Sequence, residues 1–194
     1  MKQVDSQKLL EDLKTLTERV QKEVQERFLP LNEGQLAWRP RPESWSIADC
    51  MAHLNKYARY YNKVMRAKME ESEEEVQKTF TSSHLGRTMY RTMKLGKKKN
   101  IRKKMRAPKG YNPIQNPEII GSEPIAEFIR HQDTMKDLLD RAKDANLKKI
   151  KIPISISKIV KMRLGDALAF IIYHNERHVQ QAHQVMSHPN FPKT

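Results

Sequence analysis

Four segments of the chain carry apolar residues at the spacing of one face of an α-helix. This pattern predicts helices over about residues 6–28, 47–72, 124–146 and 164–186. Pro30 ends the first helix, whereas Pro124 is tolerated in the first turn of the third. Ser46 is expected to cap the second helix, with Asp49 completing a capping box. The sequence therefore predicts an all-α fold.

The connections between the helices predict their order in space. A crossover over about residues 73–121 joins the second and third helices, and it is far longer than the two to eight residues usual in bundles. A long crossover lets consecutive helices lie parallel, so we expect a four-helix bundle in the order up, down, down, up. Before the fourth helix, isoleucines alternate with other residues as in a strand, at positions 150, 152, 154 and 156. Because no partner strand is evident, we interpret this stretch as an extended connection.

Two histidines lie one helical turn apart on the face of the last helix that is predicted to be buried. His174 and His178 fall within or beside its apolar series. Residues at i and i+4 are neighbours on a helix surface, so both imidazoles can converge on one point. The pair alone leaves open a second interpretation, in which each is an ordinary core histidine satisfied by a hydrogen bond.

A third histidine, His53, lies on the inward side of the second helix. At about 1.5 Å per residue, it is about 10 Å from the start of its helix, while His174 and His178 are roughly 12 to 18 Å from the end of theirs. Antiparallel packing brings all three to a similar depth. Three imidazoles leave a fourth position for water or substrate, as in catalytic zinc sites. We therefore predict a divalent metal site of His53, His174 and His178, with zinc first and nickel, cobalt or copper also compatible.

Several short motifs resemble those of the DinB/YfiT-like superfamily. They are Trp38-Arg39-Pro40-x-Pro42-x-x-Trp45-Ser46-Ile47, His53-Leu54, Leu164-Gly165-Asp166-Ala167-Leu168, His174-x-x-Arg177-His178-x-x-Gln181 and, in the crossover, Ala107-Pro108-Lys109-Gly110-Tyr111-Asn112-Pro113. The resemblance implies a four-helix bundle with a divalent metal held by one histidine of the second helix and two of the fourth, which map onto His53, His174 and His178. It leaves the chemistry open, because relatives include thiol S-transferases that use bacillithiol or mycothiol, a mycothiol-dependent isomerase and proteins described as metal-dependent hydrolases.

Composition agrees with a compact helical protein. The length of 194 residues suits a single domain over 1–194, and 38% hydrophobic residues with only six glycines exclude a fibrous or disordered chain. One cysteine excludes an intramolecular disulfide and fits a reducing cytoplasm. The sequence has no recognisable N-terminal signal and no apolar run of transmembrane length, so we expect a cytoplasmic protein. The oligomeric state stays open, with a homodimer as one alternative.

Positive charge gathers in the crossover. Eleven of the net fourteen positive charges lie between Thr79 and Pro117, where there is no acidic residue, and Lys97 to Lys104 form the densest run. Such a run can contact nucleic acid, an anionic membrane surface or an acidic substrate, or it can be a solvated loop that aids solubility. We expect the solvated loop, because base-stacking candidates are limited to Tyr90 and Tyr111 and no sequence-reading motif is evident.

Two functions from different classes follow. The first is a metal-dependent enzyme of the thiol S-transferase or hydrolase type, acting on a small molecule with or without a low-molecular-weight thiol as cofactor. The second is a non-catalytic binding module whose basic crossover docks a polyanion. The sequence assigns no general base: Tyr57 is a weak catalytic candidate, Cys50 is expected to be a packed thiol, and Glu176 and Arg177 are expected at the surface or at an interface. We favour the enzyme.

Overall fold

The computed structural model describes residues 3–96, 100–101, 105–121 and 123–193. It is mostly helical, with 60% of residues in helix, six α-helices and two small sheets in the described ranges. The all-α expectation therefore holds broadly. The densest basic run lies outside the described residues at Lys97, Lys98, Lys99, Lys103 and Lys104.

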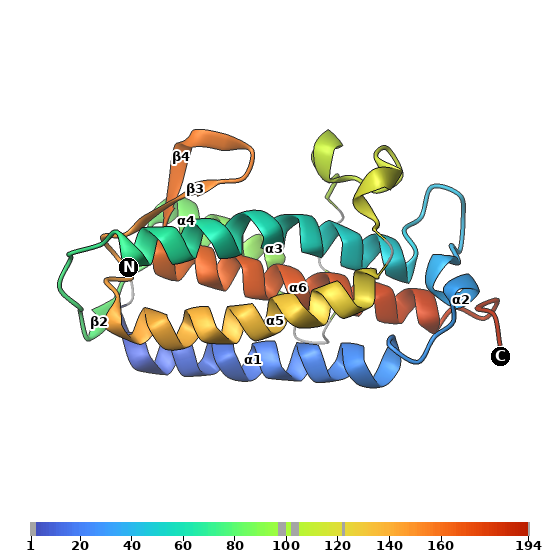
Figure 1. The fold of residues 1–194 in the computed structure, drawn as a ribbon, viewed down its shortest axis with the longest axis horizontal. Helices are drawn as coiled ribbons and strands as arrows, with labels where there is room; N and C mark the ends of the chain where they lie inside the picture. Colours follow the sequence, from blue (N-terminus) through green and yellow to red (C-terminus); the bar gives the residue numbers. More distant parts are fainter. Residues whose placement is uncertain (1–2, 97–99, 102–104, 122, 194) are drawn as a thin grey trace.

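Four long helices lie side by side along the length of the molecule (Figure 1). They are α1 (Ser6–Arg27), α3 (Ile47–Glu70), α5 (Pro124–Arg141) and α6 (Leu164–Met186). Both α1 and α3 contact α5 and α6, so an apolar core forms between the helices. The buried face of α1 includes Leu10, Leu13, Val20 and Val24, all at most 1% exposed. No helix in the described part of the chain is both long and apolar enough to cross a membrane.

The start of α3 is fixed by the predicted capping box. The Ser46 hydroxyl accepts a hydrogen bond from the Asp49 backbone N–H at 3.1 Å, and the Asp49 carboxylate accepts one from the Ser46 N–H at 2.8 Å. Arg39 donates two further bonds to the same carboxylate, at 2.8 and 2.9 Å. Asp49 is fully buried, so these donors replace the hydrogen bonds to water that its carboxylate loses on burial. The short helix α2 (Glu33–Ala37) precedes this junction.

Part of the crossover is a helix, α4 (His84–Met93), which packs on α6. The Asp166 carboxylate of α6 accepts hydrogen bonds from the Ser83 N–H and hydroxyl at 2.9 and 2.8 Å, at the start of α4. Gly86 permits the contact, since a Cβ there would lie 2.2 Å from the Asp166 carboxyl. The solvated-loop prediction is therefore wrong for residues 84–93. The rest of the crossover includes β2 (Thr79–Phe80), paired with β1 (Val4–Asp5), and the 3₁₀ turns η1 (Lys109–Tyr111) and η2 (Pro117–Ile119).

After α5 and the turn η3 (Ala142–Asp144), the chain forms a β-hairpin of β3 (Lys151–Ile154) and β4 (Ser157–Arg163). The expectation of an extended connection without a partner is therefore wrong. The partner is the next stretch of the chain, where exposed residues do not alternate between apolar and polar and so give no strand pattern. The hairpin projects from the helices beside α3 and α4 (Figure 1).

Candidate metal centre

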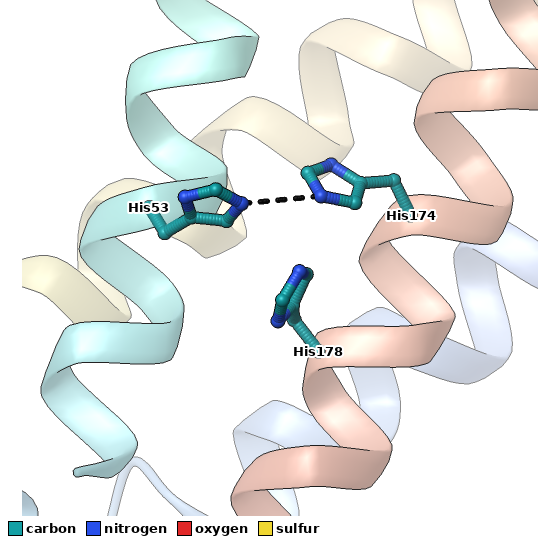
Figure 2. Close-up of side chains that lie close together, drawn as sticks. All are labelled: His53, His174 and His178. Atoms are coloured by element: carbon teal, nitrogen blue, oxygen red, sulfur yellow. Dashed lines mark hydrogen bonds between the residues drawn. The ribbon is translucent and has the colours of Figure 1, made fainter. Parts of the chain in front are cut away.

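The three predicted histidines face one another across the contact between α3 and α6 (Figure 2). The Nε2 atoms of His53 and His174 are 3.1 Å apart, and one nitrogen from each of the three rings lies within 4.8 Å of the others. Two nitrogens that share a tetrahedral zinc ion are about 3.3 Å apart, given zinc–nitrogen distances near 2.0 to 2.1 Å. The first pair already has this spacing.

Hydrogen bonds orient two of the three rings. The backbone carbonyl of Tyr111 lies 2.7 Å from His53 Nδ1, and the side-chain carbonyl of Gln181 lies 3.0 Å from His178 Nδ1. Carbonyl oxygens only accept, so each Nδ1 carries the proton and each Nε2 keeps its lone pair. His174 Nδ1 has no hydrogen-bond partner among the described residues. This donor set fits a metal, because ligand histidines commonly donate their second N–H to an acceptor of the protein.

Burial keeps the imidazoles neutral. His53 and His174 are 2% and 4% exposed, and His178 is partly buried. Burial lowers the pKa of His53 to about 4, although the hydrogen bond to Tyr111 opposes this change. Burial, followed by the neighbouring imidazoles and Arg177, also lowers the pKa of His174 and His178 well below the ordinary value. At neutral pH the rings are therefore in the form that binds a metal.

Aromatic side chains surround the cluster. The Trp45 ring stacks on His178 with centroids 5.5 Å apart, and Phe170 stacks on His174 at 5.7 Å. Tyr57 lies edge-on to His174 at 4.7 Å and contacts the Tyr111 ring at 4.3 Å. Tyr111 belongs to the crossover, so this segment covers the cluster as well as orienting His53. The covering rings exclude water from most of the site.

Comparison with known protein families matches residues 16–182 to the DinB superfamily. The chain belongs to the DinB superfamily. The matched range contains all three clustered histidines and covers most of the chain, which confirms the resemblance drawn from the short motifs. No curated protein and no solved structure matches the chain significantly.

The site of this DinB-superfamily protein contains two groups that its sequence indicated only indirectly. Gln181 stands in the last motif, three residues after His178, where one helical turn brings its side chain onto the ring. The Tyr111 carbonyl is a backbone atom, so no side-chain pattern marks it. Its signal was the Ala107–Pro113 tract, which resembles the crossover of some family members.

The other residues singled out in the sequence do not join the histidine cluster as ligands. Cys50 is fully buried in the core with Ile47 and outside the histidine cluster, and burial raises the pKa of its thiol. Burial also raises the pKa of Tyr57, so its hydroxyl stays protonated and can donate but not act as a base. Arg177, expected at the surface or at an interface, is instead buried within the chain, with 4% exposed. Because α6 contacts α1, α3 and α4, little of its circumference faces solvent.

Proposed function

We propose that this protein is a metal-dependent enzyme of the transferase or hydrolase type. In this proposal His53, His174 and His178 hold one divalent ion through their Nε2 atoms, with zinc the first expectation. The observation that carries it is the convergence of three neutral imidazoles, two of which have Nδ1 engaged by carbonyl oxygens. Three protein ligands leave a position for a substrate or cofactor, which a closed four-ligand site does not.

The ion would supply one chemical property, the lowering of the pKa of a coordinated thiol or water molecule. The protein's own residues then have separate tasks. Gln181 and the Tyr111 carbonyl hold two imidazoles in a fixed orientation. Tyr57, whose ring lies beside His174, offers a protonated hydroxyl that is suited to donating a hydrogen bond to a small substrate. As a whole residue His178 is more exposed than His53 and His174, so we place the approach of the substrate on its side, past Trp45.

We further propose that the four long helices form one bundle domain in the order up, down, down, up. The contacts of α3 with both α5 and α6, and of α1 with the same two helices, support this arrangement. The depth of the histidines supports it as well, because antiparallel packing of α3 and α6 brings His53 level with both α6 histidines.

Metal analysis of protein purified without an affinity tag tests the proposed site. We expect about one divalent transition metal per chain, and His53→Ala, His174→Ala and His178→Ala should each lose most of it. His183→Ala is the matched control, because His183 lies on the same helix but faces Glu23 at 3.5 Å. Full metal occupancy in the triple alanine variant would contradict the proposal.

A further inference from the structure

The positive charge of the chain comes from two segments. Between Ala145 and Gly165, the hairpin region has six basic residues and no acidic one. The crossover between Thr79 and Pro117 has eleven, again with no acidic residue. Since the net charge is +14, these seventeen charges leave the rest of the chain at −3. The two segments meet in space, because α4 contacts β4 and the Arg163 guanidinium donates to the Thr81 carbonyl.

The second strand of the hairpin, β4, and the turn before it expose aliphatic side chains close to lysines. Ile159 is 91% exposed and Ile156 at the turn is 63% exposed, which makes them the two most exposed large hydrophobic residues of the described chain. Lys158 precedes Ile159 and Lys161 follows it by two residues, and both lysines are exposed without an ion pair in the described ranges. Before β3, the Lys149 ammonium group lies 3.9 Å from the Glu74 carboxylate.

The hairpin is firmly attached to the helices. Ile152 and Ile154 of β3 are at most 9% exposed and belong to the main core, and Met162 of β4 is fully buried. The Tyr61 hydroxyl accepts a hydrogen bond from the Ser155 N–H at 3.2 Å, just before the turn. The exposed isoleucines are therefore presented from a fixed support and not from a loose loop.

We propose that the β3–β4 hairpin docks on an anionic lipid surface, with Ile156 and Ile159 entering the headgroup region and Lys158 and Lys161 binding lipid phosphates or carboxylates. This inference goes beyond the metal site and does not depend on it. Aliphatic side chains flanked by lysines gain free energy from apolar burial and from attraction to anionic lipids together.

Two other occupants fit the hairpin less well. Nucleic acid would use the lysines, but isoleucine offers no ring on which a base can stack. A second copy of this chain would place the lysines of one hairpin near those of the other, which like-charge repulsion disfavours. A lipid surface uses both the charge and the aliphatic side chains.

Co-sedimentation with vesicles tests the proposal. The protein should bind phosphatidylcholine vesicles that contain phosphatidylserine, bind pure phosphatidylcholine poorly, and release as salt rises. Ile159→Ser should weaken binding about tenfold, and the double change Lys158→Gln with Lys161→Gln by about tenfold or more. Ile159 contributes almost nothing to the core, so circular dichroism and metal content should not change.

Matched controls separate this patch from general surface effects. Leu29→Ser removes an exposed leucine, 52% accessible, at the end of α1, and Lys8→Gln with Lys22→Gln removes two exposed charges from α1. Both should bind anionic vesicles as the unchanged protein does. Equal vesicle binding by Ile159→Ser overturns the proposal, as does absence of binding to anionic vesicles. Oligonucleotide binding that is lost only in the lysine variant, or a dimer that Ile159→Ser dissociates, would overturn it in favour of nucleic acid or a second copy.

Discussion

The indole Nε1 of Trp45 donates a hydrogen bond to Asn112 Oδ1 at 3.3 Å, and so joins the segment before α3 to the crossover. Trp45 contacts the histidine cluster directly, and Asn112 is joined to it through the neighbouring residue. The Trp45 ring stacks on His178, and Asn112 follows Tyr111, whose carbonyl binds His53. The bond therefore holds the crossover segment and Trp45 together over the histidine cluster.

In the Trp45→Phe variant we expect the crossover segment to move away from the histidine cluster more often, while the metal stays bound at equilibrium. The variant keeps an aromatic ring against His178 but lacks the N–H that binds Asn112. One neutral hydrogen bond contributes about 1 kcal/mol, so a chelator should remove the metal on the order of threefold to tenfold faster. The control is Trp38→Phe, since Trp38 packs on His188 and Phe191 away from the cluster. Equal removal rates in both variants would show that the bond does not hold the crossover segment over the cluster.

Gln181 is expected to act as a positioning residue for His178. Gln181→Ala leaves His178 Nδ1 without its acceptor, and loss of such a partner typically weakens metal affinity about 10-fold to 100-fold. Gln181→Glu retains an acceptor oxygen and should stay within a few-fold of the unchanged protein. Gln180→Ala is the control, because Gln180 is the neighbouring residue but lines a different surface pocket, together with His183. Competition with a chromogenic chelator gives the three affinities, and an alanine variant that binds as tightly as the glutamate variant would contradict the assignment.

The helices and the histidine cluster were accessible from the sequence because they rest on local rules. The predicted helix over 164–186 coincides with α6, since a continuous apolar series marks its buried face throughout. The capping box at Ser46 is likewise contained within four residues. The meeting of His53 with His174 followed from helix rise and antiparallel packing.

Of the two features that were missed, one depends on a contact between distant segments and the other on a neighbouring strand without a strand-like sequence pattern. Residues 84–93 pack on α6 because Gly86 leaves room for Asp166, a pairing of residues 80 positions apart that no local pattern encodes. The strand β4 has exposed residues on both faces, so it lacks the alternation by which strands are predicted. The single domain and the metal ligation by the three histidines stay predictions.

The junction before α3 gives a prediction about stability. Arg39→Ala removes two hydrogen bonds from the fully buried Asp49 carboxylate. Because the Arg39 side chain is 34% exposed, we expect a loss of about 2 to 3 kcal/mol in the free energy of unfolding, below the value for a wholly buried pair. Arg41→Ala should cost about 0.5 kcal/mol or less, since Arg41 and Glu43 are both exposed. Urea denaturation measures both, and similar losses would contradict the role of Asp49.

His131 predicts a dependence of stability on pH. Burial lowers its pKa below the ordinary value near 6.5, although Glu127 at 3.1 Å raises it; Arg59 and Arg130 lower it further. The unfolded chain therefore takes up a proton first as the pH falls through about 6.5, and the contribution of His131 to stability is lost below that pH. Measured with chelator present, the unchanged protein should lose up to about 1 kcal/mol more than His131→Gln between pH 7.5 and 5.5. Parallel pH profiles for the two proteins would exclude this contribution.

Cobalt substitution distinguishes an open metal site from a closed one. If His53, His174 and His178 hold the ion, one position stays free for a thiol, so a low-molecular-weight thiol should change the visible spectrum by forming a sulfur–cobalt bond. His178→Ala should lose the response, whereas His188→Ala, beyond the end of α6, should keep it. Cys50 cannot produce the signal in its place, because it is fully buried outside the cluster. Cobalt that binds the histidines but gives no spectral change with thiol would argue against the S-transferase type, and a change with pH alone would favour the hydrolase type, since water would then be the ligand that titrates.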